Sequence, residues 1–312
     1  MGDEFSRIAQ YFAPLSGPEG LGLLDDAALY APPAGCDLVL TVDQMLESVH
    51  FLPGDPPDLI ARKLLRRNLS DLAAMGATAT GYLLTTALPP GTDESWLEVF
   101  ARGLAQDQAA YGIRLFGGDS SSALAHISLS ATFIGYVEAG KALRRNGARP
   151  GDEIWVTGTI GDAALGLQAR RGALQDLSGF LTNRSMLPSP RMGLQLAGIA
   201  TAAVDISDGL VQDLGHICKA SGVAATIMAH LVPASAVAAA FGDAMLETRL
   251  TGGDDYELLL AVPPGHEAAL RAACGDLLVT KIGYFSAGPA PVRVLGADRR
   301  EIPLTKAGWR HF

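Results

Sequence analysis

The sequence predicts an α/β protein with two domains, and three observations support this. Short apolar runs that stop at Gly, Pro or Asp are typical of strands, and they alternate with longer amphipathic segments typical of helices. The chain has 312 residues, enough for two domains. The stretch "RRNGARPGDEI", rich in Gly, Pro and charge, interrupts the pattern. We therefore expect domains at 1–148 and 149–312, with the boundary near Ala148 to Asp152.

The first half mixes strands and helices. A strand is expected around the apolar run Leu38 to Leu40 in "CDLVLTVDQML", and a helix from Asp58, as N-cap, to Gly76, as C-cap. The elements expected next are a strand in "TGYLLTTALPPG", an amphipathic helix in "DESWLEVFARGLAQDQAAYG", a short strand in "IRLFGG" that enters a glycine turn, and a long alternating strand in "HISLSATFIGYV".

The second half repeats the alternation of strands and helices. It begins with a strand, a glycine loop and a helix in "EIWVTGTIGDAALGLQ", followed by a strand and a helix in "AAVDISDGLVQDLGHICKASG". Strands are then expected in "AATIMA" and in "YELLLAV"; "KIGYF" starts the last segment and "GWRHF" closes the chain. No repeat of a solenoid period and no long low-complexity tract is present.

Composition excludes several classes of protein. Hydrophobic residues make up 48% and charged residues 18%, which predicts a packed core and argues against global disorder. A net charge of -9 argues against a nucleic-acid partner, because phosphate binding needs clustered Lys and Arg. The start "MGDEFSRIAQYF" lacks the apolar region of a secretory signal, although it formally fits a Met-Gly-x-x-x-Ser myristoylation pattern. No apolar run is long enough to span a bilayer, so we expect no membrane partner.

The three cysteines indicate a reducing compartment. Cys36, Cys218 and Cys274 lie far apart and form no Cys-x-x-Cys pair, so they read as small buried hydrophobic residues. We therefore expect no disulfide and no zinc site, and a cytoplasmic location.

The sequence matches neither of two common phosphate-binding motifs. The chain has no Gly-x-x-x-x-Gly-Lys-Ser/Thr sequence, so no P-loop lysine is available. In "VTGTIGDAALG", Ile160 stands where the second glycine of a dinucleotide loop belongs. We interpret this segment as a strand-to-helix turn and leave open whether it contacts an anion.

Aspartates beside apolar runs are the main functional signal. Single positions have simple structural explanations: Asp208 or Ser207 can cap a helix, Asp119 can occupy a turn, and Asp254 and Asp255 can be solvated. The full set is Asp25, Asp26, Asp43, Asp71, Asp119, Asp205, Asp208, Asp254 and Asp255.

Asp71 is the hardest of these to explain structurally. On the expected helix it shares a partly apolar face with Leu64, Asn68 and Met75. A carboxylate there costs roughly several kcal/mol unless it is paired, hydrogen-bonded or bound to metal. Asn68 is a possible partner but does not cancel the charge, and too few nearby cations are visible to neutralise this many acids. Oxygen ligands without a Cys or His cluster favour Mg²⁺, so the acids indicate a site where several Mg²⁺ ions hold a polyphosphate. Glycine turns such as "FGGDSSS" would then let backbone N–H groups approach phosphate oxygens.

Eight blocks, in order, resemble the thiamine-monophosphate kinase family. They are "DDAAL", "TVDQMLESVHF", "NLSDLAAMGA", "FGGDSS", "GKALRRNGARPGD", "WVTGTIGDAALG", "AVDISDGLVQDLGHI" and "GGDDYEL". The resemblance extends over essentially the whole chain and places it in the superfamily of aminoimidazole ribonucleotide synthetase. It implies an N-terminal mixed sheet that pairs across a homodimer, a C-terminal α/β domain, and an active site in the cleft between the domains.

The resemblance also implies the reaction and the residues that carry it. The family phosphorylates thiamine monophosphate to thiamine diphosphate with ATP and Mg²⁺, by direct in-line transfer without a covalent intermediate. The implied Mg²⁺ ligands are Asp26, Thr41, Asp43, Asp71, Asp119, Asp205 and Asp208. The implied ATP-binding residues are Gly118, Asp119, Arg145 and Ser207, and the implied substrate-binding residues are His50, Asp254 and Trp309. In this interpretation Gly209 permits the tight entry into the helix after Asp208.

Alternative functions remain open at this point. An aminoimidazole ribonucleotide synthetase-like enzyme would use the same metal and ATP on another small phosphorylated substrate. The selenophosphate and hydrogenase-maturation relatives fit less well, because no cysteine precedes Cys36 and the chain ends in "GWRHF". A regulatory module that binds nucleotide without turnover is disfavoured by the retained aspartates.

Overall fold

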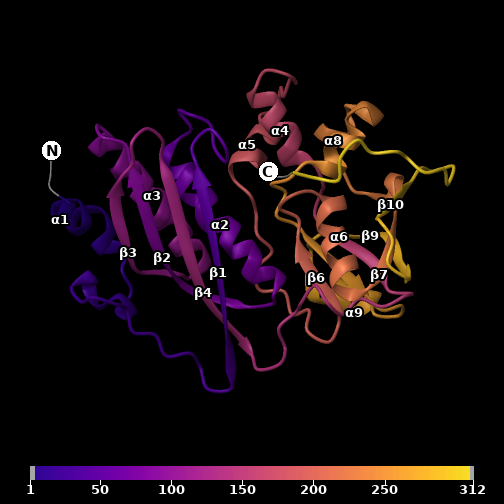
Figure 1. Ribbon diagram of the computed structural model, residues 1–312, viewed down its shortest axis with the longest axis horizontal. Coiled ribbons are helices and arrows are strands. Elements are labelled where there is room, and N and C mark those ends of the chain that lie inside the picture. Colours follow the sequence, from indigo (N-terminus) through magenta and orange to yellow (C-terminus); the bar gives the residue numbers. More distant parts are fainter. Residues whose placement is uncertain (1–3, 310–312) are drawn as a thin grey trace. The chain divides into compact units, whose positions relative to one another are not determined.

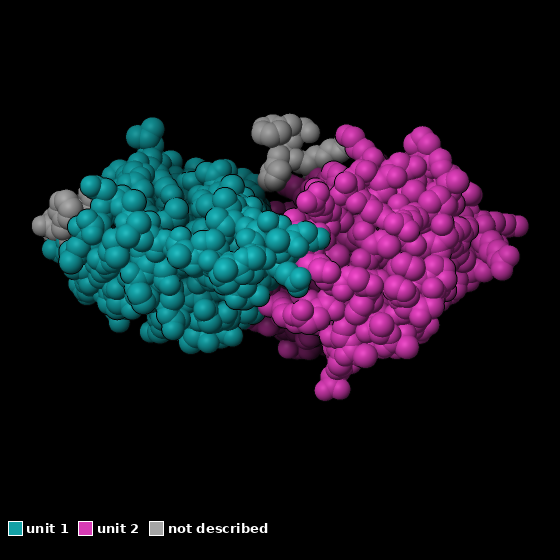
Figure 2. Space-filling view, turned by 90° about the horizontal axis from the view of Figure 1, so that it is seen from below, with its two compact units in different colours: residues 1–72, 77–140 teal, residues 73–76, 141–312 magenta. Residues whose placement is uncertain are grey.

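The computed structural model describes residues 4–309 and divides them into two compact units, coloured separately in Figure 2. Unit 1 runs to Leu72 and continues over Ala77–Gly140, while unit 2 holds Ala73–Gly76 and the chain from Lys141 onward. Gly2 of the myristoylation pattern and the last three residues of "GWRHF" lie outside the described residues.

Unit 1 is built on a four-stranded mixed sheet, as predicted (Figure 1). Its strands are β1 (Cys36–Leu46), β2 (Thr78–Leu88), β3 (Arg114–Ser122) and β4 (Ser128–Glu138). The order across the sheet is β1-β4-β2-β3, so β1 and β3 are the two edges. β4 pairs antiparallel with β1 and β2, and β3 pairs parallel with β2.

Two long helices accompany this sheet, α2 (Pro57–Ala74) and α3 (Glu94–Tyr111). The chain before them forms α1 (Glu4–Arg7) and short helical turns over Ile8–Phe12, Ala13–Leu15 and Pro18–Leu23. α2 begins one residue before Asp58, so this residue lies in the first turn and its prediction as N-cap is wrong. Gly76 ends the helix as predicted: its φ is 70°, and the Ala77 N–H bonds back to the Leu72 carbonyl.

The two faces of the sheet differ in exposure. On one face Tyr82 and Phe133 stack with ring centroids 5.2 Å apart, within the buried core of unit 1. The other face keeps large apolar side chains exposed on β1, with Leu40 63% and Val42 61% exposed. The register pairs Leu40 with Ile134 and Val42 with Thr132, so this open apolar face continues onto β4.

The structure corrects the prediction for "FGGDSSS". The sequence suggested a strand that stops at a glycine turn, but β3 continues through this segment to Ser122 and pairs with β2 along its length. Gly118 is needed for that pairing, because a Cβ here would lie 2.9 Å from the carbonyl carbon of Leu84 and closer still to its oxygen. The glycines therefore allow close strand contact instead of forming a turn.

Unit 2 contains a six-stranded sheet with the order β10-β7-β9-β5-β8-β6 (Figure 1). Only β10 and β7 pair in parallel. The strands are β5 (Glu153–Thr157), β6 (Ala202–Asp205), β7 (Val223–Met228), β8 (Leu258–Val262), β9 (Val279–Ala287) and β10 (Arg293–Leu295). The helices are α4 (Asp162–Arg170), α5 (Phe180–Met186), α6 (Leu210–Ser221), α7 (Ala236–Ala239), α8 (Leu246–Thr251) and α9 (Glu267–Cys274), with helical turns at Ala229–Leu231 and Gly242–Met245. Across residues 4–309, none of the helices has the length and apolarity that crossing a membrane requires.

The core of unit 2 fixes the strand-to-helix step at β6 and α6. Val204 on β6 and Leu210 and Leu214 on α6 belong to one buried apolar cluster. Gly209 joins the two elements with φ 127°, and a Cβ there would meet the Thr251 backbone at 2.8 Å. The predicted need for glycine at this entry is thus confirmed.

Replacing Gly118 with alanine should destabilise unit 1 by about 2 kcal/mol, because the new methyl group would displace the backbone of β2. Gly117→Ala is the matched control, since its Cβ would lie 3.4 Å from one methyl group of Leu83. Urea denaturation of both variants would measure the difference. Equal midpoints for the two would contradict this account of β3.

Candidate functional site

The carboxyl end of β6 carries the first group of predicted site residues. Asp205 is the last residue of the strand and is buried, and Ser207 and Asp208 follow in the loop before α6. This agrees with the expectation that the two acids stand where a buried strand ends. Open α/β sheets place ligands at such strand ends.

Two distant segments are bonded to this loop. The Asp254 N–H donates to the Ser207 carbonyl at 2.9 Å, and the Trp309 N–H donates to the Asp208 carbonyl at 2.9 Å. Gln212 Nε2 donates to the Trp309 carbonyl at 2.7 Å and to Asp208 Oδ2 at 2.9 Å. The structure therefore brings together Ser207, Asp208, Asp254 and Trp309, and the indole of Trp309 stays half exposed.

The backbone at Asp254 is strained. Asp254 has φ 72° and Tyr256 has φ 53°, both in the left-handed region that favours glycine. The Tyr256 hydroxyl donates to Asp254 Oδ1 at 3.0 Å, and the Tyr256 N–H donates to the Ile206 carbonyl. Two such residues store about 1–3 kcal/mol each, and this kind of strain concentrates at functional sites. Here the hydrogen bonds of Asp254 and Tyr256 hold this conformation and position the Asp254 carboxylate.

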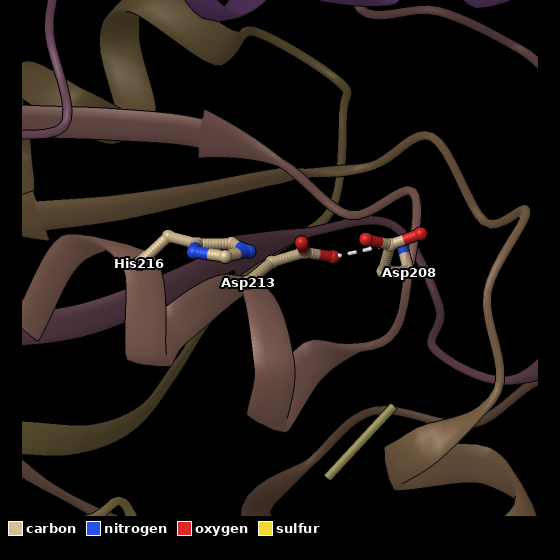
Figure 3. A group of neighbouring side chains, drawn as sticks. All are labelled: Asp208, Asp213 and His216. Atoms are coloured by element: carbon tan, nitrogen blue, oxygen red, sulfur yellow. Dashed lines mark hydrogen bonds between the residues drawn. The ribbon is translucent and has the colours of Figure 1, made fainter. Parts of the chain in front are cut away.

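Asp213 is a site residue that sequence reasoning missed. Its Oδ2 accepts the backbone N–H groups of residues 207, 208 and 209, each at 3.0 Å. Figure 3 shows Asp213 between Asp208 and His216, with its carboxylate turned toward the Asp208 backbone. The sequence pattern that could have indicated this role is an acid four residues after a helix-entry glycine. This spacing lets the side chain reach back to the start of its helix.

The charges around Asp213 affect each other. Burial raises its pKa to about 7, opposed by the N–H group of Asp208 and reinforced by the Asp208 carboxylate. The pKa of His216 is lowered, first by burial and then by the positive charge of Arg145. Arg145, predicted to bind ATP phosphates, is exposed. Its effect on the pKa of His216 indicates that it lies close to the helix that carries Asp213 and His216.

Oxygen and nitrogen atoms of Asp208, Asp213 and His216 all lie within 4.8 Å of one another, close enough to hold a metal ion (Figure 3). Asp213 Oδ2 is committed to three N–H groups, so Asp208 is the better carboxylate donor of this group. The sequence suggested ligands that are oxygen atoms alone, and the nearby imidazole was not expected.

The N–H groups of the glycine loop before α4 already bind a carboxyl group of the protein itself, that of Asp255, whose pKa burial raises to about 8. Asp255 is fully buried, and its carboxylate accepts the Gly161 N–H at 2.6 Å and the Ala163 N–H at 3.3 Å. The alternative of a solvated Asp255 is therefore wrong. Since a protein carboxylate occupies the start of α4, the loop serves structure, as the strand-to-helix interpretation expected.

A second group of predicted residues lies between β1 and α2 in unit 1. Thr41 Oγ1 donates to Asp71 Oδ2 at 2.6 Å, so the helix carboxylate is hydrogen-bonded across to the strand. Asp43, two residues further along the same side of β1, faces Arg67 of α2 with Nε 3.3 Å from its Oδ2. Asn68, the partner suggested for Asp71, instead donates to the Leu64 carbonyl.

His50 lies in the turn that follows β1. Its Nδ1 accepts the Leu46 N–H at 3.0 Å, and Lys63 Nζ donates to its carbonyl at 3.1 Å. These bonds fix the ring and set the tautomer with the proton on Nε2. A substrate-binding role for His50 stays a prediction.

A third group lines a cavity of about 780 Å³ in unit 1. The cavity is bordered by the N-terminal segment and by the open face of the sheet, including Tyr30 and Phe116, whose rings lie 5.6 Å apart. Asp26, Gly118 and Asp119 all line it. The volume and the mixed lining suit a small organic ligand with polar groups.

The second and third groups lie at opposite edges of one sheet. Thr41 and Asp43 are on edge strand β1, whereas Gly118 and Asp119 are on edge strand β3. Three strand spacings separate these edges, about 14 Å. Within unit 1, the predicted Mg²⁺ ligands therefore form two separate sets.

Known proteins match this chain along most of its length. The family model for AIR synthase related protein matches residues 24–137 with its N-terminal domain and 149–295 with its C-terminal domain. The thiamine-monophosphate kinase of Caulobacter vibrioides is 42% identical over 320 residues, covering 99% of this chain and 90% of the relative. The chain belongs to the thiamine-monophosphate kinase family.

Solved structures of thiamine-monophosphate kinases share the fold. The enzyme from Stenotrophomonas maltophilia K279a has a TM-score of 0.81 at 39% identity, with 93% of each chain covered. The structure of AaThiL complexed with AMPPCP and TMP has a TM-score of 0.79 at 30% identity, covering 92% of this chain and 91% of that one. The α/β fold expected from the resemblance is thus confirmed.

The residues present fit the Mg²⁺ ions that this kinase family implies. The two sets in unit 1 and the loop after β6 offer carboxylate and hydroxyl oxygens, which are the donors Mg²⁺ prefers. These side chains are half-buried or exposed, with Asp205 the buried exception, which leaves room for the water molecules that Mg²⁺ retains.

Replacing Asp213 with alanine should destabilise the kinase by about 2 kcal/mol, because three N–H groups lose their acceptor. Asp213→Asn keeps an oxygen acceptor and is the matched control. Burial raises the pKa of Asp213, so wild type should lose stability relative to Asp213→Asn as pH rises from about 4 through 7. Thermal unfolding across that range would test both points, and a pH-independent difference would contradict the second.

Proposed function

We propose that this chain catalyses the phosphorylation of thiamine monophosphate by ATP, giving thiamine diphosphate and ADP. The observation that carries the proposal is the grouping of Ser207, Asp208, Asp254 and Trp309 at the end of β6. This occurs in a chain that matches a thiamine-monophosphate kinase over 99% of its length. The relative bound to AMPPCP and TMP supports the same pair of ligands.

Unit 1 supplies most of the nucleotide and metal ligands in this proposal. Gly118 and Asp119 bind ATP from the wall of the cavity, and Tyr30 and Phe116 offer aromatic surface to the base. Magnesium, when bound, neutralises the phosphate oxygens and holds them in position, as it does in other phosphoryl-transfer enzymes. Its proposed ligands are Asp26, Thr41, Asp43, Asp71 and Asp119 in unit 1, and Asp205 and Asp208 in unit 2.

Unit 2 supplies two of the three predicted substrate-binding residues, Asp254 and Trp309, while His50 belongs to unit 1. The exposed indole of Trp309 is a flat surface on which the pyrimidine or the cationic thiazolium ring can stack. The Asp254 carboxylate, fixed by its strained backbone and by Tyr256, adds a negative charge that favours the thiazolium cation. Arg145 and Ser207 contribute a cation and a hydroxyl toward phosphate oxygens.

The transfer itself needs no strong base from the protein. The attacking oxygen belongs to the phosphate of thiamine monophosphate and is already anionic. A bond forms from this oxygen to the γ-phosphorus of ATP, while the bond from that phosphorus to the bridging oxygen of ADP breaks. The contribution of the chain is to hold the two phosphates in line and to screen their repulsion.

We also propose that the chain acts as a homodimer that pairs through the open face of the unit 1 sheet. Leu38, Leu40, Val42 and Leu83 are exposed there beside β4. Leu38, Leu40 and Leu83 also line the cavity, so a partner that covers this face would cover the cavity as well. The two ligand sets at opposite edges of the sheet support the same idea. A twofold partner can bring its Asp26 and Asp119 beside Thr41, Asp43 and Asp71 of the first chain.

The kinase proposal predicts ADP release that depends on thiamine monophosphate, with thiamine diphosphate as the product identified by mass spectrometry. Asp71→Asn should fold normally and lose activity by at least about a hundredfold, because a carboxylate that would hold Mg²⁺ becomes a neutral amide. Circular dichroism would confirm folding.

Normal turnover by a folded Asp71→Asn would exclude this role for the residue. If wild type releases no ADP with thiamine monophosphate, the search moves to other small phosphorylated acceptors, with aminoimidazole precursors first.

The dimer proposal predicts recovery of activity when two inactive variants are mixed. Asp71→Asn and Asp119→Asn each damage a different ligand set, so a mixed dimer has one site with both defects and one intact site. Complete exchange of subunits should restore about a quarter of wild-type activity. Mixing Asp71→Asn with Asp43→Asn is the control, because both changes fall in one set and no site is repaired. No recovery in the first mixture would show that the two sets do not meet across a dimer.

A further inference from the structure

Helix α2 places a cation among the acidic residues at the β1 edge. Arg67 precedes Asp71 by four residues, so both project from the same side of the helix. Arg67 Nε lies 3.3 Å from Asp43 Oδ2, and Nη2 lies 3.4 Å from Asp43 Oδ1. The guanidinium and the carboxylate therefore form an ion pair with one long hydrogen bond, donated by Nη2.

Partial burial strengthens this ion pair. The Arg67 side chain is 12% exposed and the Asp43 side chain 27% exposed, so water screens the pair less than it would at an open surface. Arginine also keeps its charge at every pH of interest. Asp43 is thus neutralised by a group of the chain itself before any metal arrives.

Asp71 lies beside this ion pair on the same helix. It accepts a hydrogen bond from Thr41 Oγ1 at 2.6 Å, which holds its carboxylate against β1. A divalent cation that approaches this strand and helix therefore meets Asp43 already paired with a guanidinium.

We propose that Arg67 is an internal counter-ion of Asp43 that competes with Mg²⁺ for this carboxylate. The inference rests on the proposed function, which makes Asp43 a metal ligand. It goes further by assigning a role to Arg67: divalent cations bind here more weakly than the number of acids suggests, because Arg67 supplies part of the positive charge.

The test is a titration of the full-length protein with Mn²⁺ in the absence of nucleotide, followed by the electron paramagnetic resonance signal of free Mn²⁺. Arg67→Gln should raise the affinity for Mn²⁺ by roughly tenfold, because a unit charge about 4 Å from the divalent ion is removed. Arg102→Gln is the matched control, since it removes the same charge from an exposed position on α3. Higher salt should shrink the difference between wild type and Arg67→Gln.

A double variant shows whether the effect passes through Asp43. In the Asp43→Asn background, Arg67→Gln should raise the affinity by a smaller factor, because competition for Asp43 is already gone and only the repulsion between the guanidinium and the ion is relieved. Equal Mn²⁺ binding by wild type and Arg67→Gln, or equal gains in both backgrounds, would overturn the proposal. Absence of Mn²⁺ binding in both wild type and Arg67→Gln would also overturn it. The coupled ADP assay on the same samples tests the kinase function separately, because thiamine monophosphate-dependent ADP release can succeed whatever the Mn²⁺ titration gives.

Discussion

The carboxylate of Asp213 holds three consecutive backbone N–H groups, and the geometry of the unit 2 site depends on it. These bonds set the loop from Ser207 to Gly209, and this loop in turn accepts the N–H groups of Asp254 and Trp309 through its carbonyls. One buried acid therefore positions residues from three separate parts of the sequence. The strained backbone of Asp254 is tolerated because the surrounding bonds over-determine its conformation.

The sheet of unit 1 imposes a different constraint: it keeps two sets of predicted Mg²⁺ ligands apart. Alternation along β1 directs Thr41 and Asp43 toward α2 and directs Leu40 and Val42 to the open face. The same strand thus presents metal ligands on one side and an apolar surface on the other. Because β3 forms the far edge, Asp119 stands three strands away from Thr41 and Asp43. An enzyme that uses both sets in one reaction gains from a second copy of the chain.

Residues whose roles follow from local pattern could be predicted from the sequence. The strand end at Asp205, the helix-entry glycine at 209 and the helix end at Gly76 all depend on neighbours in the chain, and the structure has them as expected. The path of β3 could not be predicted, because Gly118 is explained by the backbone of Leu84, more than thirty positions earlier. Burial of Asp255 could not be predicted for the same reason: its partners are N–H groups in the loop before α4, far from it in the sequence. Pairing between segments that are far apart in the chain produces no periodic pattern in the sequence, so it cannot be predicted from such patterns.

The partners that neutralise the acidic residues were the part of the site predicted least well from the sequence, and the contacts of these residues show why. Counting nearby cations along the chain missed Arg67 as a partner of Asp43, although the two lie on adjacent elements. A net charge of -9 invites the conclusion that metal must balance every acid. Buried acids here are balanced in several ways instead: Asp213 and Asp255 by backbone N–H groups, and Asp107 by Arg62 and Arg66. Acids without such internal partners remain the ones for which divalent metal is the physical solution.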